Sequence, residues 1–319
     1  MAGSNSLLIS HHSLFIFPFL PLHFMKNWVL ILSAVILFGC EKNADISVDK
    51  QDSKLVVDAA IEDLQAPVVV LTKSIDYFNN VPAAEYAGSF VHNAVVTVSD
   101  GSKTITLKEY SARLDSVNKS YYYTIDSANA AAIIVGAQGK TYKLTIQVNN
   151  QQYEATASIP VLTKKIDSLW WKQAPQNPDT SKAVIIARVT DPPGLGNYIR
   201  YFTKINKEPI FPGLASVFDD QLVDGTTYDI QVDRGYDKNE KLKLSNDAFG
   251  YYKRGDTVTV KFTNIDKTTY DFWRTWEYGY QSNGNPFSSP GKVLGNISNN
   301  ALGNFSGYAV QYKTIIIPK

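Results

Sequence analysis

The amino-acid sequence predicts an all-β protein with one short helix. Along most of the chain, short apolar runs alternate with polar residues at a period of two, which is typical of half-buried strands. Tyrosine is abundant, at 19 residues, whereas methionine occurs only twice, and threonine and valine recur at alternate positions. These residue types favour pleated sheet. Clusters of Gly, Pro, Asn and Asp separate the runs and indicate turns.

The charge balance excludes one broad class of partner. The net charge is +1, and Lys26 is the only charged residue before Cys40, so the rest of the chain carries 30 basic and 30 acidic side chains. Nucleic-acid affinity comes largely from clustered Lys and Arg that release counterions. The sequence therefore predicts no nucleic-acid partner. The single cysteine also excludes an internal disulfide.

An apolar run near the N-terminus predicts a signal peptide. Residues 28–39 read WVLILSAVILFG and follow Met25 and Lys26. Such a run is about 18 Å long as a helix, well short of the roughly 30 Å of a bilayer core. A short basic region before an apolar run of this length is typical of a signal peptide. Residues 1–24 carry no charge, so we expect translation to start at Met25; a long or two-part hydrophobic leader is the alternative.

The end of this run resembles a bacterial lipobox. Leu37 supplies the aliphatic residue, Gly39 the small residue before the cleavage site, and Cys40 the thiol that forms a thioether to diacylglycerol, while Phe38 is bulkier than usual at its position. The alternative is that Cys40 is a small buried apolar residue. We expect lipidation, because a diacylglycerol and an N-acyl chain together anchor a protein stably. The mature protein would then begin at Cys40.

The first part of the mature chain predicts a β-sandwich. A polar tether, residues 40–53, precedes a region, residues 54–160, with about seven strands in roughly 105 residues and turns every 8–12 residues. This spacing is typical of an immunoglobulin-like or fibronectin-like sandwich. The expected β-runs are residues 55–63, 68–75, 93–101, 103–110, 121–126, 140–148 and 151–160.

The remaining residues, 161–319, predict a second β-rich domain. We expect residues 161–181 to form a junction followed by a loop. The apolar and aromatic residues of 267–281 recur at helical spacing, so we expect a short amphipathic helix there. The expected β-runs are residues 183–191, 198–206, 227–232, 256–265 and 308–317.

Several segments, taken in their order, resemble one family. They are LVVDAAIED, AVVTVSDG, GKTYKLTIQVNNQQYEATASIP, KKIDSLWW, DPPGLGNYIRY, FDDQLVDGTTYDI, TYDFWRTWE and GNPFSSPGKVLGNISNNALGNFSGYAV. Together with the lipobox they are similar to the Bacteroidota lipoprotein family called domain of unknown function 4249, over essentially Cys40 to Lys319. The resemblance implies a cell-envelope lipoprotein that is often encoded beside a TonB-dependent outer-membrane transporter. The family has no established activity, so the resemblance implies no reaction.

The mature chain offers little material for catalysis. His92 would be its single histidine, and no cysteine beyond Cys40 is present, so zinc sites and Ser-His-Asp or Cys-His catalysis lack their residues. No glycine-rich phosphate-binding motif follows an expected strand. Asp219, Asp220 and Asp224 could form a hydrolase site or a Ca²⁺ loop, but adjacent residues of a strand point to opposite faces. We therefore predict no catalytic residue, no metal and no cofactor.

Aromatic residues are the remaining candidates for binding. Trp170 and Trp171 lie in the expected junction, and Trp273 and Trp276 lie in the expected helix. Exposed aromatic faces could stack on sugars or dock a partner protein. The alternative is that Trp273 and Trp276, three residues apart, form the buried stripe by which the helix packs on a sheet.

These observations predict an outer-membrane lipoprotein that acts as a non-catalytic accessory or binding module. Its expected partners are the membrane, through the lipid on Cys40, and a TonB-dependent transporter or another envelope protein. A glycan-binding surface lipoprotein that uses the tryptophans is the first alternative. An aspartate-based hydrolase is the second.

Overall fold

The computed structural model describes most of the chain after the tether. The described residues are 52–75, 87–113, 119–129, 133–175, 177–238, 250–282, 288 and 291–319. Residues 51–319 form one compact unit, and every structural statement below concerns the described residues of that unit.

The first part of this unit is a sandwich of two antiparallel layers. One layer contains, in spatial order, β1 (Leu55–Glu62), β2 (Val68–Lys73), β6 (Lys119–Thr124) and β5 (Lys108–Arg113). The facing layer contains β4 (Thr104–Thr106), β3 (Val95–Ser99), β7 (Lys140–Val148) and β8 (Gln151–Ile159). Apart from the additional edge strand β4, this is the order of strands in the two layers of the immunoglobulin fold.

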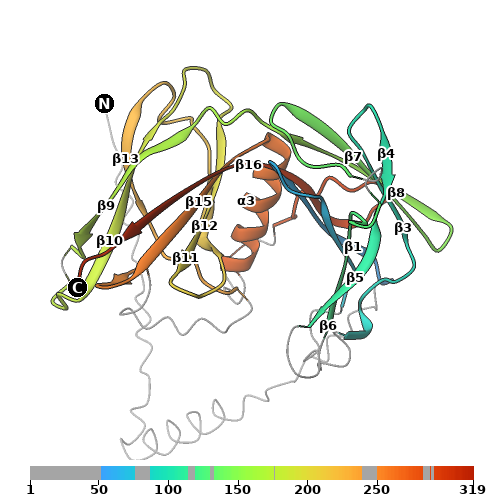
Figure 1. Cartoon of the computed structure of the whole chain (residues 1–319), viewed down its shortest axis with the longest axis horizontal. Helices are drawn as coiled ribbons and strands as arrows, with labels where there is room; N and C mark the ends of the chain where they lie inside the picture. The colour runs from blue at the N-terminus through green and yellow to red at the C-terminus, as the bar shows by residue number, and fades with distance from the viewer. Residues whose placement is uncertain are drawn as a thin grey trace, which may run out of the picture. The chain divides into compact units, whose positions relative to one another are not determined.

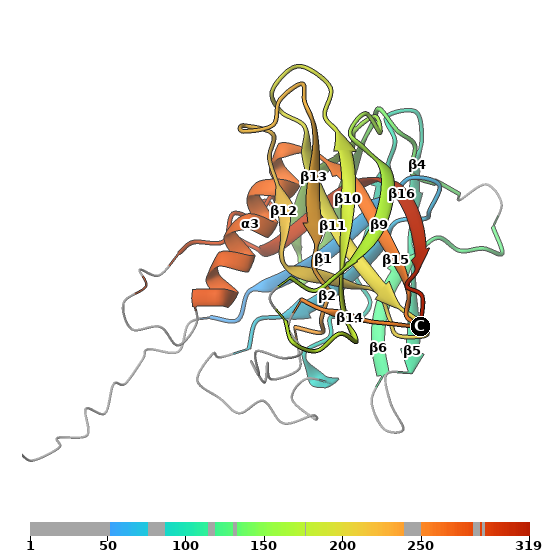
Figure 2. The ribbon, with the colours of Figure 1, turned by 90° about the vertical axis from the view of Figure 1, so that its left-hand side faces the viewer.

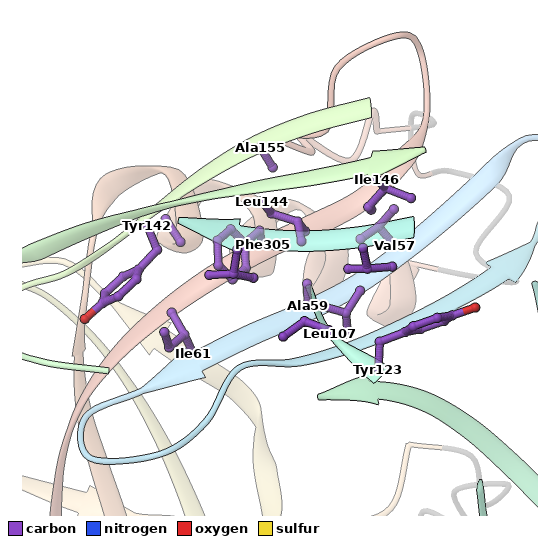
Figure 3. Close-up of a cluster of buried hydrophobic side chains, with 14 of the residues drawn as sticks. Val57, Ala59, Ile61, Leu107, Tyr123, Tyr142, Leu144, Ile146, Ala155 and Phe305 are labelled. Atoms are coloured by element: carbon purple, nitrogen blue, oxygen red, sulfur yellow. The ribbon is translucent and has the colours of Figure 1, made fainter. Parts of the chain in front are cut away.

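Alternation along the strands builds the core of this sandwich. In β1, Val57, Ala59 and Ile61 are buried, and the residues between them point to the other face of the sheet. Figure 3 shows these side chains meeting Leu144 and Ile146 of the facing layer. Fully burying an aliphatic or aromatic side chain of this size contributes about 1.5–3 kcal/mol.

A second sandwich follows in the chain. Its outer layer contains β9 (Lys165–Gln173), β10 (Lys182–Thr190), β13 (Thr227–Val232) and β14 (Tyr252–Lys253). The layer that it faces contains β12 (Phe211–Phe218), β11 (Tyr198–Ile205), β15 (Thr257–Ile265) and β16 (Leu302–Ile316).

Strand β16 belongs to both sandwiches. It pairs in parallel with β1 through its first half and antiparallel with β15 through its second half, so the inner layers join into one eight-stranded sheet. Figure 1 shows β16 running from one sandwich to the other. Phe305 contributes to the first core and Ile315 to the second, on the same face of the sheet.

The pairing of β16 with β1 requires glycine at one position. Gly303 lies opposite Val57 and has a positive φ of 101°. A Cβ atom at Gly303 would lie 1.8 Å from the Val57 carbonyl oxygen. Because both the backbone conformation and the close approach exclude a side chain, glycine allows the first and last strands to meet here.

Helix α3 (Lys267–Ser282) packs on the opposite face of the sheet, against β12, β11 and β16 (Figures 1 and 2). Asp266 caps its N-terminus, because its Oδ1 accepts a hydrogen bond from Thr269 N at 2.8 Å. The other carboxylate oxygen accepts a hydrogen bond from Ser158 N in β8 at 3.1 Å. One side chain therefore fixes the start of the helix and ties it to the first sandwich.

Two amide side chains hold the segment that connects the sandwiches. Asn264 Oδ1 accepts hydrogen bonds from Thr163 N and Lys164 N, and Asn264 Nδ2 donates to Lys164 O at 2.7 Å. Gln311 bonds both backbone groups of Ile166. The expected boundary at residue 160 lies next to this segment. The second core lies after that boundary, whereas the first core also includes Ile297, Phe305 and Ala309 from beyond it. The boundary between residues 54–160 and 161–319 stays a prediction.

The prediction of an all-β protein with one short helix is confirmed, and the helix matches the expected residues 267–281. The expected junction at 161–181 was wrong in part, because residues 165–173 form β9, which is stabilised by pairing with β10. The expected run 103–110 splits at the buried Leu107 into β4 and β5, which belong to different layers. The last strand also begins at Leu302, earlier than residue 308, because its first half pairs with β1.

Phe305→Ala tests the contribution of β16 to the first core. Phe305 is fully buried, so its truncation should lower the free energy of unfolding by about 3–5 kcal/mol. Tyr312→Ala on the same strand is the control, because Tyr312 is 58% exposed, and it should cost about 0.5 kcal/mol. Denaturant unfolding measures both. Equal losses would show that β16 does not complete the first core.

Candidate functional site

The predicted lipid-attachment residue Cys40 and the lipobox residues Leu37, Phe38 and Gly39 lie outside the described residues. Among the residues that the structure describes, no helix is both long and apolar enough to cross a membrane.

Trp273 and Trp276 lie together on the sheet-facing side of α3. Their ring centroids are 5.8 Å apart, and Trp276 stacks on Tyr280 at 5.5 Å with the planes 10° apart. Thr269, Phe272 and Glu277 are the buried residues of the helix, so the tryptophans belong to the stripe that recurs every three or four residues. Both tryptophans are half-buried.

A buried arginine lies against this stripe. The guanidinium of Arg200, from β11, lies 3.4 Å from the ring centroid of Trp273. Arg200 Nη1 and Trp273 Nε1 both donate hydrogen bonds to Tyr308 OH, at 3.2 and 2.9 Å. Arginine stacks well on aromatic faces because its guanidinium is planar and weakly hydrated. This contact fixes the ring of Trp273 from the side of the sheet.

A buried carboxylate continues the same network. Ser216 Oγ accepts a hydrogen bond from Arg200 Nε and donates one to Glu277, whose carboxylate also accepts from Ser216 N at 2.8 Å. Lys238 Nζ lies 3.0 Å from Glu277 Oε1. Burial lowers the pKa of Lys238, and the charge of Glu277 opposes that shift. The face beneath α3 is therefore polar and charged, although it is largely shielded from water.

Trp170 and Trp171 lie on β9 and point to opposite faces. Trp171 packs against the core of the second sandwich, with the Arg254 guanidinium 4.6 Å from its ring centroid. Trp170 lies on the outer face near Arg188, which forms a bidentate ion pair with Asp229. Both tryptophans are half-buried. The structure thus places the two predicted tryptophan pairs on different elements.

The aspartates divide between two locations. Asp219 accepts a hydrogen bond from Tyr270 OH on α3 at 3.0 Å. Asp220 instead lies near Asp191 and Asp224, with carboxylate oxygens of all three within 4.8 Å of one another. The alternative of a site built from Asp219, Asp220 and Asp224 therefore does not match this arrangement, because Asp219 turns toward the helix.

Backbone amides and a lysine are the partners of this second cluster. Asp220 accepts hydrogen bonds from Gly196 N and Asn197 N, both at 2.8 Å. Burial alone would raise the pKa of Asp220, but these hydrogen bonds outweigh it and lower the pKa. Lys164 Nζ lies 2.8 Å from Asp191 Oδ1, and both side chains are fully buried. The cluster links the loop that contains Asp220 to the loop that contains Gly196 and Asn197, and Lys164 is its cation.

Sequence reasoning missed Asp58, a polar residue of β1 on the face of the sheet that α3 covers in part. Its side chain is exposed, yet burial raises the pKa of its carboxyl, and the charge of Arg200 opposes this shift. The Asp58 side chain therefore contacts solvent, but surrounding protein removes part of its hydration. We infer that it lies in a recessed position. In the sequence, Asp58 is one of the polar residues that alternate with buried ones in a strand, so its unusual environment cannot be predicted from the pattern.

Asp58→Asn should stabilise the protein at neutral pH. Because the folded pKa of Asp58 is raised, the folded state holds the proton more tightly than the unfolded state, and stability falls as the carboxyl ionises. The variant should melt at a higher temperature than the wild type at pH 7. This difference should vanish below about pH 3.9, where the unfolded carboxyl is protonated too.

Thermal unfolding between pH 3 and pH 8 measures the difference. Asp52→Asn, at another exposed aspartate, is the matched control and should leave the melting temperature unchanged. A lower melting temperature of Asp58→Asn at pH 7, or a gain that persists at pH 3, would contradict the desolvation of Asp58.

The comparison with known families confirms the resemblance seen in the sequence. The family model described as Domain of unknown function (DUF4249) matches residues 41–314. No curated protein matches the chain. Since the match covers both sandwiches and α3, from the residue after Cys40 nearly to the C-terminus, the chain belongs to the DUF4249 family.

Proposed function

We propose that this protein is an outer-membrane lipoprotein, anchored through Cys40, that acts as a non-catalytic accessory or binding module of the cell envelope. The observation that carries the proposal is the lipobox, Leu37 to Cys40, which follows an apolar run and directly precedes residue 41, where the family match begins. The chemistry of lipid attachment needs a cysteine at this place, and the chain has its only cysteine there.

The distance from the anchor to the first strand limits the choice of partner. An extended chain spans at most about 3.3–3.6 Å per residue, so the stretch from Cys40 to Leu55 reaches about 50 Å at most. The β unit therefore stays close to the membrane surface. A membrane-embedded TonB-dependent transporter lies within this reach, and it is the partner that we propose.

The aspartate cluster supports a non-catalytic role. Asp220 is occupied by backbone amides and Asp191 by Lys164. A hydrolase needs carboxylates that are free to exchange protons with a substrate or a water molecule. In this cluster the oxygens instead serve as hydrogen-bond acceptors for the fold.

A second candidate function is glycan binding through the tryptophans. It is favoured by Trp170, whose half-buried ring lies on the outer face of β9 with Arg188 at 5.6 Å and Lys172 at 5.9 Å from its centroid. A partly exposed indole ring offers an aromatic surface on which a sugar can stack.

Cys40→Ala should release the protein from membranes, because neither the thioether nor the N-acyl chain can form. Fractionation of cells followed by mass spectrometry of the N-terminus measures this, and the wild type should carry an acylated Cys40. Phe38→Ala is the matched control: it removes the bulky residue of the lipobox and should leave lipidation intact. A soluble wild-type protein that begins at Met1 or Met25 would refute the anchor.

The wild-type protein should also bring a transporter with it. Membranes solubilised in mild detergent and purified through a C-terminal tag should yield a β-barrel transporter in stoichiometric amount. The same purification from Cys40→Ala cells should yield much less transporter. Without the anchor, the protein is no longer held at high effective concentration beside a membrane-embedded partner. Recovery of the lipidated protein alone would contradict the proposed partnership while leaving the anchor in place.

A further inference from the structure

A row of side chains crosses the inner sheet of the first sandwich on the face turned away from its core. Tyr110 lies opposite Tyr122, and Asp58 lies opposite both Val70 in β2 and Asn304 in β16. Val69 lies opposite Tyr123, so Val70 and Tyr122 are neighbours on the other face. These five residues form a row across five adjacent strands, about 19 Å long at about 4.8 Å per strand.

The row changes from aromatic to polar along its length. The rings of Tyr110 and Tyr122 stack with their centroids 6.1 Å apart and their planes at 27°. Both tyrosines and Val70 are half-buried, Asp58 is exposed, and Asn304 is buried. An aromatic pair at one end is thus followed by an apolar step and then by a carboxylate that solvent can reach.

The polar end of the row has unused hydrogen-bonding capacity. Asn304 Nδ2 donates to Ser306 Oγ at 2.7 Å, but Asn304 Oδ1, a buried acceptor, has no donor among the described residues. Burial raises the pKa of the Asp58 carboxyl. Among the described residues, the positive charge of Arg200 opposes this shift. Buried polar atoms are nearly always satisfied, and an exception calls for an explanation. Asn304 Oδ1 is such an exception among the described residues, and the exposed Asp58 carboxylate beside it is an acceptor that a ligand can reach.

The composition of the row selects among ligands. Acceptors require a ligand with hydroxyl, amide or ammonium donors, and the positive charge of Arg200, which acts on Asp58, disfavours an ammonium ion. The carboxylate of Asp58 disfavours an acidic ligand. The tyrosine pair requires an apolar face beside the donors. A sugar ring combines hydroxyl donors on its edge with apolar C–H groups on its faces.

We propose that this row binds a neutral glycan chain, with sugar hydroxyls donating to Asp58 and a sugar ring stacking on Tyr122. The inference rests on the proposed role as a binding module and names the class of its ligand. It assigns the glycan to the first sandwich, in place of the tryptophans of β9 and α3. A hydroxyl bound to Asp58 also comes within about one strand spacing of Asn304 Oδ1.

The test uses full-length lipidated protein in detergent micelles. An array of neutral and acidic oligosaccharides identifies the bound glycans, and calorimetric titration with the best neutral oligosaccharide gives the dissociation constant. We expect binding to neutral glycans. Tyr122→Ala should weaken binding about tenfold through the lost stacking, and Asp58→Asn should weaken it by a similar factor through the lost charge-assisted hydrogen bonds.

Matched variants separate the row from the rest of the surface. Tyr312→Ala removes an exposed tyrosine outside the row, and Asp52→Asn removes an exposed carboxylate outside it; both should bind as the wild type does. Asp58→Asn is expected to be more stable than the wild type at neutral pH, so weaker binding by this variant cannot come from unfolding.

Several results would overturn the assignment. They are the absence of neutral glycan binding by the wild type, binding of acidic glycans alone, and unchanged binding by both Asp58→Asn and Tyr122→Ala. Loss of binding in Trp170→Ala with retention in Tyr122→Ala would place the glycan on the outer face of β9 instead. Release of Cys40→Ala from membranes is measured separately. The proposed lipid anchor can therefore be confirmed even if the proposed glycan site is refuted.

Discussion

The parallel pairing of β16 with β1 is the interaction on which the rest of the structure depends. It joins the last strand of the chain to the first, and so merges two four-stranded layers into one sheet. Phe305 closes the first core from this strand, and Ile317, just after it, lies in the second. Neither core is complete before the C-terminal residues arrive. Pairings this distant in sequence are slow to form, because the loop-closure entropy must be overcome first.

This pairing also determines what lies beneath α3. Since alternate residues of β16 face the two cores, those between them, Asn304, Ser306 and Tyr308, face the opposite side of the sheet, and all three are buried. A helix on an ordinary sheet would meet aliphatic residues there. Here α3 meets Arg200 and places Glu277 in its own buried stripe. Buried charges are weak evidence for stability, because desolvation offsets much of the attraction, but their hydrogen bonds restrict a helix to one position.

The sequence predicted the elements better than their partners. Alternation identified most strands, and helical spacing identified residues 267–281, because both signals are local. Residues 165–173 were missed as a strand, since the adjacent Trp170 and Trp171 break the alternation and face opposite sides of β9. Nothing local shows that Asp58 lies beside Asn304, because that contact depends on a register set by residues far away in the chain. The lipobox, in contrast, could be predicted from the sequence alone, because a peptidase recognises a continuous segment of the chain.

Two unfavourable features of the fold lie side by side on one face of the sheet, and their proximity argues for function there. Asp58 is desolvated and Asn304 Oδ1 has no donor among the described residues, although leucine or threonine would suit a purely structural sheet at either place. Sequences that satisfy local rules nearly everywhere tend to break them at functional sites. A ligand that brings hydroxyl donors to Asp58 would offset the desolvation of its carboxylate. The free protein already bears the free-energy cost of desolvating Asp58, so this cost is not added when the ligand binds. This is expected of a preorganised site.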